Sequence, residues 1–170
     1  LDPAFGGGQF LRAIALRLAK YGHSLENIRS RIFGSEDDVV YLNHKDNILT
    51  HKIATLSVVP YNEFMNTKTK SKFDVIIGNP PYNRGIIQGH KSKIARGNAH
   101  IAFIERSLEL LSNAGEAKLI LPTNFLTLPS LKTARNFLLE NANITEIVIY
   151  NNTDKGYFDI SNQNVLCMTF

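Results

Sequence analysis

The strongest structural signal in this chain is the stretch Phe73-Asp74-Val75-Ile76-Ile77-Gly78-Asn79-Pro80-Pro81-Tyr82. Its first six residues form a short, mostly apolar run, typical of a buried strand in a parallel sheet. The run ends at two prolines, and neither has an N–H group to join a helix or a β-ladder. The sequence therefore predicts a strand over 73–78 that ends in a stiff turn.

The turn Asn79-Pro80-Pro81-Tyr82 presents an unusual set of chemical groups. A residue that precedes a proline is pushed toward extended geometry, so the carbonyls here are expected to point outward. Two acceptors and an aromatic face suit a planar group that carries an NH2, such as the exocyclic amine of adenine. The alternative is a plain turn at the end of a strand.

The chain begins with a second motif, Asp2-Pro3-Ala4-Phe5-Gly6-Gly7-Gly8-Gln9-Phe10, which joins a strand end to a helix. Glycines permit positive φ and let a ligand approach the backbone. The N–H groups at the start of the helix face the same crevice at the carboxyl edge of the sheet. Taken alone, the motif leaves open a dinucleotide site or a tight turn.

Together the two motifs resemble the hallmarks of S-adenosylmethionine-dependent amino-methyltransferases, and most closely those of adenine-N6 DNA methyltransferases. The hallmarks are [Asp/Asn/Ser]-Pro-Pro-[Tyr/Phe] and Asp-Pro-Ala-x-Gly-x-Gly-x-Phe. The resemblance implies an α/β, Rossmann-like class I methyltransferase fold. Its sheet is mostly parallel and seven-stranded, has helices on both faces, and inserts the seventh strand antiparallel beside the sixth. The implied reaction is methyl transfer from S-adenosyl-L-methionine to the N6 amine of adenine in DNA, as the modification part of a restriction-modification system.

The resemblance assigns roles to individual residues of the two motifs. The cofactor pocket is expected to be lined by Asp2, Ala4, Phe5, Gly6, Gly8 and Phe10, with Asn79 beside them. The catalytic turn comprises Asn79, Pro80, Pro81 and Tyr82. The Asn79 side-chain oxygen and the Pro80 carbonyl would accept hydrogen bonds from the target amine, and Tyr82 would stack on a base flipped out of the duplex.

Two acidic segments are further cofactor candidates. Gly34-Ser35-Glu36-Asp37-Asp38 resembles the family's Gly-x-Glu-x-Asp pattern, which implies that Glu36, with Asp37 beside it, accepts both ribose hydroxyls; the alternative is that either acid caps the next helix. Asn62-Glu63-Phe64-Met65 stands where the family often has Asp-Phe-Leu after the third strand. Glu63 and Phe64 are therefore expected at the cofactor adenine, with Asn62 as an alternative contact and a surface loop as the alternative structure.

Basic residues surround the catalytic turn in the sequence. No Asp or Glu occurs from Val75 to Ile104, whereas Arg84, Lys91, Lys93 and Arg96 all fall there. Lys68, Lys70 and Lys72 lie just upstream. These residues are expected to contact DNA phosphates, and the alternative is a solvated lysine-rich loop.

Phe158 is the expected second stacking aromatic. The family often has an aromatic-Phe pair between the sixth and seventh strands, and Tyr157-Phe158 occupies that place. Packing of both rings as core under the loop is the alternative.

Strands and helices alternate along the chain, which is typical of a parallel α/β sheet. Strands are predicted at 1–4, 28–34, 55–59, 73–78, 117–121, 144–150 and 165–170. Helices are predicted at 8–21, 37–47, 101–111 and 131–141. Gly22 is expected to end the first helix, and Asn113-Ala114-Gly115 the third.

Composition bounds the class of protein. The 170 residues suit one domain, and a net charge of +4 is only weak support for a polyanionic partner. The single cysteine, Cys167, excludes an internal disulfide framework and a cysteine-rich zinc site. His44, His51, His90 and His100 show no ligand spacing, so no metal is expected. No apolar run approaches the roughly 18 residues of a membrane span, so no membrane partner is expected and the cytoplasm is the expected compartment.

Other functions remain open at this point. Release-factor glutamine methyltransferases and some rRNA guanine methyltransferases share the Asn-Pro-Pro-Tyr motif, and a non-catalytic nucleic-acid-binding fragment is a further alternative. The expected partners are double-stranded DNA with a flipped adenine, and a target-recognition domain or restriction subunit. Because the chain begins inside the first motif, we expect a fragment of a longer protein, without its target-recognition domain.

Overall fold

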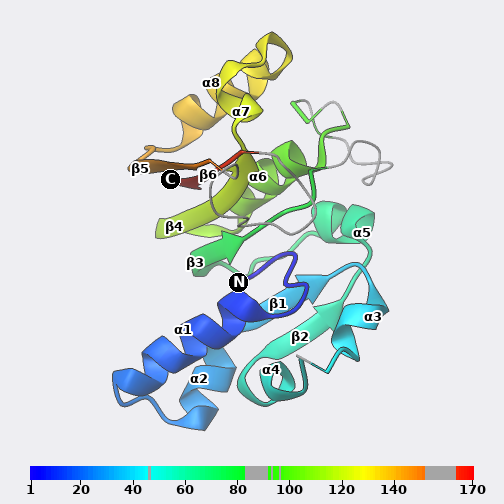
Figure 1. Ribbon diagram of the computed structural model, residues 1–170, viewed down its shortest axis with the longest axis vertical. Coiled ribbons are helices and arrows are strands. Elements are labelled where there is room, and N and C mark those ends of the chain that lie inside the picture. The colour runs from blue at the N-terminus through cyan, green and yellow to red at the C-terminus, as the bar shows by residue number, and fades with distance from the viewer. Residues whose placement is uncertain (46, 83–91, 93, 96, 152–163) are drawn as a thin grey trace. The chain divides into compact units, whose positions relative to one another are not determined.

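The computed structural model describes residues 1–45, 47–82, 92, 94–95, 97–151 and 164–170. Within it, the chain divides into two compact units, Leu1–Lys68 and Thr69–Phe170. Each unit carries helices on its own parallel or mixed sheet (Figure 1). A single domain over the whole chain stays a prediction.

The first unit holds two parallel strands and five helices among its described residues. In chain order they are α1 Gln9–Lys20, α2 Leu25–Arg31, β1 Phe33–Glu36, α3 Val39–Leu42, α4 Asn47–Ile53, β2 Thr55–Val58 and α5 Tyr61–Asn66. The glycine-rich loop joins the sheet where Asp2 forms an isolated parallel bridge with Gly34. A core of Phe5, Leu11, Ala15, Ile28, Ile32 and Ala54 packs α1 and α2 against the strands.

The prediction of a strand at 28–34 is wrong except at its last two residues. Residues Leu25–Arg31 form α2, and β1 begins only at Phe33. The Ser24 hydroxyl caps this helix by accepting a hydrogen bond from the Asn27 N–H at 3.2 Å. Ile28 and Ile32 lie one helical turn apart and both enter the core, so their spacing did not require a strand.

The prediction of one helix at 37–47 is also wrong, because the structure has two separate helices there. The Asp38 carboxylate caps α3 by accepting from the Val40 N–H at 2.8 Å, and that helix ends after one turn at Leu42. A separate helix, α4, begins at Asn47. Val39 and Val40 are exposed, so the segment has no continuous buried face that could support a longer helix.

The second unit contains a four-stranded sheet in the order β3-β4-β6-β5. Its elements are β3 Phe73–Gly78, α6 Ala99–Leu110, β4 Leu111–Pro122, α7 Asn124–Thr127, the 3-10 helix η1 Pro129–Leu131, α8 Lys132–Asn141, β5 Glu146–Tyr150 and β6 Val165–Thr169. β3 has the predicted bounds and pairs parallel with β4. The last strand, β6, runs antiparallel to both β4 and β5, which confirms the predicted antiparallel insertion.

The end of the helix before β4 differs from the prediction. α6 ends at Leu110 and β4 begins at once, so Asn113-Ala114-Gly115 lies inside the strand. The register shifts there, because Phe73 pairs with Leu111 whereas Val75 pairs with Glu116. A Cβ on Gly115 would lie 2.9 Å from the Phe73 carbonyl oxygen, so the irregular segment requires glycine.

The described residues contain six strands in two sheets, and the predicted strand at 1–4 is reduced to the bridge at Asp2. A single seven-stranded sheet therefore stays a prediction. Among the residues described, no helix has the length and apolar character to cross a membrane.

Candidate functional site

The glycine-rich loop is anchored to the end of β1. The Phe5 N–H donates to the Ser35 carbonyl at 3.1 Å, and the Gly6 N–H donates to Glu36 Oε2 at 2.8 Å. Gly6 and Gly8 have backbone φ values of 47° and 72°, which residues with a side chain rarely adopt. The loop is thus a fixed structure whose shape depends on glycine at two positions.

Glu36 lies buried beneath the loop. Its Oε1 accepts hydrogen bonds from the Tyr61 hydroxyl and from the Asp37 N–H, both at 2.9 Å. Together with the Gly6 N–H on Oε2, these donors tie the loop, the end of β1 and the start of α5 to one carboxylate. The Glu36 side chain therefore has a structural role here, and its predicted ribose contact stays a prediction.

Asp37 also supports α5, because its Oδ1 accepts from the Tyr61 N–H at 2.8 Å. The sequence left open that Glu36 or Asp37 caps the next helix. That cap on α3 comes instead from Asp38. No sequence motif indicated that Tyr61 takes part in this site. Burial next to Glu36 raises the pKa of the Tyr61 hydroxyl, which therefore remains protonated as a hydrogen-bond donor.

Asp2 is a buried acid at the start of the loop, with only 1% of its surface exposed. Its Oδ1 accepts from the Ala4 N–H at 3.2 Å, whereas Oδ2 has no hydrogen-bond partner among the described residues. Burial raises the pKa of this carboxyl from 3.8 to about 7, against the opposing effect of the Ala4 N–H. Near neutral pH the group therefore exists in both protonation states.

This raised pKa predicts how stability changes with pH. As the pH rises from about 4, the carboxyl of Asp2 ionises first in the unfolded chain, while the folded state keeps its proton until about pH 7. The contribution of Asp2 to stability is therefore complete below about pH 4, falls up to about pH 7 and is constant above it. Urea unfolding should show that the free energy of unfolding falls more between pH 5 and pH 8 in the wild type than in Asp2→Asn. An equal fall in both proteins would contradict this role of Asp2.

The start of α1 offers backbone donors. Among the residues described, the helix has no side-chain cap and no acidic residue in its first turn. The first N–H groups of a helix lack partners within it and favour an anion. With the unpaired Asp2 Oδ2 nearby in the chain, this loop combines donors for a carboxylate and an acceptor for a cationic or hydroxyl group.

The other predicted pocket residues of this unit lie in different environments. Phe5 is buried in the hydrophobic core, so its ring anchors the loop to that core. Ala4 and Phe10 are partly exposed. α5 buries Tyr61 and Met65, which leaves Asn62 and Glu63 exposed and Phe64 half-buried. This segment is a helix rather than a surface loop, and its contact with a cofactor stays a prediction.

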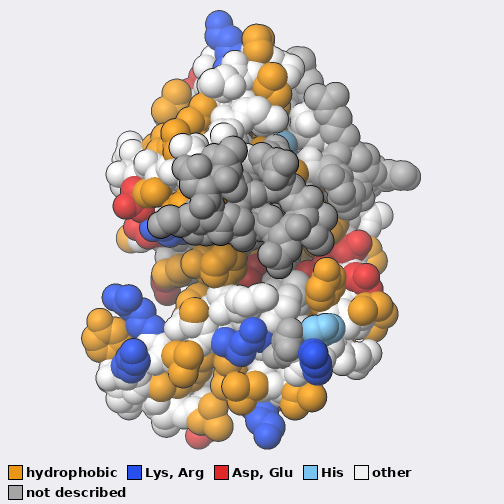
Figure 2. Space-filling model, viewed as in Figure 1, with side chains coloured by type: hydrophobic (Ala, Val, Ile, Leu, Met, Phe, Trp, Pro, Cys, Tyr) orange, Lys and Arg blue, Asp and Glu red, His pale blue; other side chains and the backbone are white. Residues whose placement is uncertain are grey.

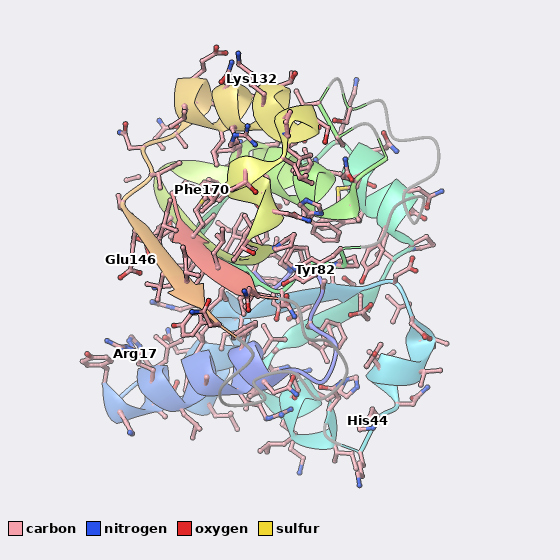
Figure 3. The ribbon with its side chains drawn as sticks, turned by 45° about the horizontal axis from the view of Figure 1, so that its top comes forward. Arg17, His44, Tyr82, Lys132, Glu146 and Phe170 are labelled. Carbon is pink, nitrogen blue, oxygen red and sulfur yellow. The ribbon has the colours of Figure 1, made fainter. Side chains whose placement is uncertain are left out.

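The catalytic turn follows β3 as predicted. Pro80 is buried, whereas Asn79 is exposed and its Oδ1 accepts a hydrogen bond from the Tyr82 hydroxyl at 2.7 Å. The same hydroxyl lies 3.3 Å from the Ile120 carbonyl oxygen in β4, so Tyr82 rests against the sheet (Figure 3). Burial raises the pKa of Tyr82, which keeps the hydroxyl protonated. Tyr82 thus orients the Asn79 amide, a contact that the sequence did not suggest.

His100 lies beside this turn and was assigned no role from the sequence. It is 4% exposed in the first turn of α6, and its ring meets that of Tyr82 edge-on with centroids 6.2 Å apart. Neither ring nitrogen has a hydrogen-bond partner among the described residues. Burial lowers the pKa of His100 to about 4, so the imidazole is neutral at pH 7 and packs as an aromatic support for Tyr82.

The other DNA-contact predictions fall on residues that the structure does not describe. Arg84, Lys91, Lys93, Arg96 and the pair Tyr157-Phe158 all lie outside the described residues. Lys68, Lys70 and Lys72 are described and exposed. Figure 2 shows further Lys and Arg side chains among hydrophobic ones over α1, α2 and α4 of the first unit.

Comparison with known proteins gives a consistent result. A profile of the family described as Eco57I restriction-modification methylase matches residues 12–157. Type II methyltransferase M.AccI of Acinetobacter calcoaceticus is 25% identical over 161 residues, which cover 88% of this chain and 28% of that protein. Type II restriction enzyme and methyltransferase RM.Eco57I of Escherichia coli is 30% identical over 95 residues, which cover 48% of this chain and 10% of that protein. The chain thus spans less than a third of the length of these two relatives.

Solved structures share the fold. The M protein of the type I restriction enzyme EcoKI matches with a TM-score of 0.79 at 20% identity, over 99% of this chain and 38% of that one. A class I S-adenosylmethionine-dependent methyltransferase from Listeria monocytogenes, itself described as putative, matches with a TM-score of 0.77 at 17% identity, over 99% of this chain and 52% of that one. The α/β fold of the described residues is therefore the class I methyltransferase fold.

Proposed function

Because the chain belongs to the Eco57I restriction-modification methylase family, we propose that it is the catalytic part of an enzyme that methylates the N6 amine of adenine in DNA. S-adenosyl-L-methionine is its cofactor. Family membership supports DNA as the substrate, and the observation that supports an amine as the methyl acceptor is the turn after β3. There, an exposed Asn79 amide is held by the Tyr82 hydroxyl beside a proline pair.

The Asn79 turn can prepare an amine for methylation. Asn79 Oδ1 retains a lone pair beyond the one that Tyr82 uses, and the Pro80 carbonyl supplies a second acceptor. Two acceptors on the hydrogens of an exocyclic amine hold electron density on its nitrogen, which is otherwise shared with the ring. When bound, S-adenosylmethionine supplies a methyl group on a positively charged sulfur. Positioning and electrostatics by the turn are then the protein's main contributions.

The glycine-rich loop suits the cofactor. The N–H groups at the start of α1 would hold its amino-acid carboxylate, and Asp2 Oδ2 is a buried acceptor for its ammonium group. Glu36, Glu63 and Phe64 would contact its nucleoside part, as the family resemblance implies. A Cβ on Gly6 would meet nothing within 4 Å, so the backbone at Gly6 is open to a ligand, which supports the same placement.

The remaining parts of the proposal concern the complete protein. Its substrate is double-stranded DNA with the adenine flipped from the stack onto Tyr82, with Phe158 as the second aromatic. RM.Eco57I is named as both restriction enzyme and methyltransferase, and EcoEI as a type I methylase subunit. We expect a target-recognition domain or restriction subunit as partner, a role in a restriction-modification system, and a cytoplasmic location. A mostly parallel sheet of seven strands is part of the same proposal.

The choice of polymer is tested by offering the full-length protein three acceptors with labelled S-adenosylmethionine. These are unmethylated duplex DNA, ribosomal RNA and release-factor protein. We expect label in the DNA alone. Label in the RNA or in a protein glutamine would overturn the proposed substrate, because the same Asn-Pro-Pro-Tyr turn serves both of those reactions.

The basic residues after the turn predict a salt effect. Replacing Lys91, Lys93 and Arg96 together with glutamine should weaken DNA binding and make the slope of log K against log salt smaller by up to about 2.7. The reason is that DNA binding releases about 0.9 counterions for each phosphate that the protein contacts, so each lost contact reduces the release by that amount. The control is a triple glutamine variant of the exposed Lys20, Lys45 and Lys52. An unchanged slope in the first variant would identify a solvated loop without phosphate contacts.

A further inference from the structure

Two polar side chains of α4 are completely buried against the glycine-rich loop. Asn47 and Thr50 are both 0% exposed, although they lie about 40 residues away from the loop in sequence. A buried polar group is costly unless it is hydrogen-bonded, so the partners of these side chains matter. Neither residue belongs to the motifs that point to the cofactor.

Asn47 holds the loop at Gly6. Its Nδ2 donates to the Gly6 carbonyl at 2.9 Å and to the Tyr41 carbonyl at 2.6 Å. Because both partners are acceptors, the NH2 end of the amide must face them, which fixes the orientation of the side chain. An aspartate at this position would turn a carboxylate oxygen toward two carbonyl oxygens.

Thr50 holds the next residue of the loop through Arg12. Arg12 Nη1 donates to the Gly7 carbonyl at 2.6 Å and to Thr50 Oγ1 at 3.1 Å. The consecutive carbonyls of Gly6 and Gly7 are therefore both held by side chains from helices. Because each trans peptide unit is planar, a fixed carbonyl direction also fixes the N–H of the next residue, which points the opposite way within the same plane.

The same two side chains lie directly against Gly8. A Cβ on Gly8 would lie 2.4 Å from Asn47 Oδ1 and 2.8 Å from Thr50 Oγ1. By contrast, a Cβ on Gly6 would meet nothing within 4 Å. The close contact at Gly8 shows that α4 supports the loop on the face where Gly8 has no side chain.

We propose that Asn47 is a positioning residue for the cofactor, which sets the conformation of Gly6-Gly7-Gly8 from α4 while Thr50 acts through Arg12. This inference rests on the proposed placement of S-adenosylmethionine on that loop. Affinity for the cofactor then depends on a buried amide that acts through the loop backbone. We therefore expect a change at Asn47 to alter cofactor affinity and to leave the orientation of the target amine by Asn79 unaffected.

The test compares Asn47→Asp with Asn43→Asp in the full-length protein. Asn43 is exposed at the end of α3, so its variant makes the same chemical change four residues away without touching the loop. For each protein we would measure Kd for S-adenosylmethionine, kcat at saturating cofactor and the urea midpoint of unfolding. We expect Asn47→Asp to raise Kd at least about tenfold, with kcat within about threefold of the wild type. Asn43→Asp should leave all three values unchanged.

A second variant covers the case in which Asn47→Asp does not fold. Thr50→Val keeps the shape of the side chain and removes only the acceptor of Arg12, and it should raise Kd a few-fold. A lower unfolding midpoint with unchanged Kd, in whichever variant folds, would overturn the positioning role and leave a purely structural one. If the wild type binds the cofactor and Gly8→Val abolishes binding while the α4 variants bind normally, the cofactor placement stands and only this inference fails.

Discussion

Asn79→Ala is expected to lower kcat for methyl transfer at least about a hundredfold, while Kd for S-adenosylmethionine changes by less than about threefold. The variant removes the side-chain oxygen that accepts from the target amine and that the Tyr82 hydroxyl orients. It leaves the glycine-rich loop intact. Single-turnover rates and cofactor titration on the full-length protein would measure the two effects separately.

Two further variants make this result specific. Asn136→Ala changes an exposed asparagine on α8 and should retain full activity. Asn79→Asp keeps an acceptor oxygen at the same position, so it should retain more activity than the alanine variant. If Asn79→Ala turned over at the wild-type rate, Asn79 would have no part in the mechanism.

Gly8→Val is expected to abolish cofactor binding, with Kd raised at least about a hundredfold. The new side chain would begin 2.4 Å from Asn47 Oδ1, and φ at this position is 72°, so the loop must move. Calorimetric titration of the full-length protein with S-adenosylmethionine would show the loss. If the valine variant does not fold, Gly8→Ala can replace it, because alanine adds the clashing Cβ without the two further methyl groups of valine.

Gly22→Val is the matched control for this experiment. Gly22 has φ of 83°, but a Cβ there would meet nothing within 4 Å. The control therefore shares the backbone strain of about 1–3 kcal/mol without the clash at the loop. It should lower stability and leave Kd unchanged. If the two variants bound cofactor equally well, the predicted pocket at the glycine-rich loop would be wrong.

The part of the fold that could be predicted from sequence is the part with a strong local signal. β3 has the predicted bounds because an apolar run followed by two prolines permits few alternatives. α1 lies within one residue of its predicted bounds, since glycines flank an amphipathic segment. α2 was missed because Ile28 and Ile32 fit either a strand or a helix, and the deciding feature was the cap at Ser24.

The site was predictable where it consists of contiguous motifs and not where it depends on packing. Asn79 follows β3 as predicted, but its hydrogen bond with Tyr82 depends on the conformation of the turn. The contact of Asn47 with Gly6 joins residues 41 apart, and His100 meets Tyr82 only once α6 has packed on its sheet. No local sequence pattern encodes such contacts, because they arise from the tertiary arrangement of separate elements.

Digestion of methylated DNA to nucleosides tests the central claim most directly. The full-length protein would be incubated with unmethylated duplex DNA and S-adenosylmethionine labelled in its methyl group, with Asn79→Ala run in parallel. We expect the label in N6-methyldeoxyadenosine, and its near absence in the Asn79→Ala reaction. Label in another nucleoside, or no label in DNA at all, would contradict adenine N6 as the acceptor.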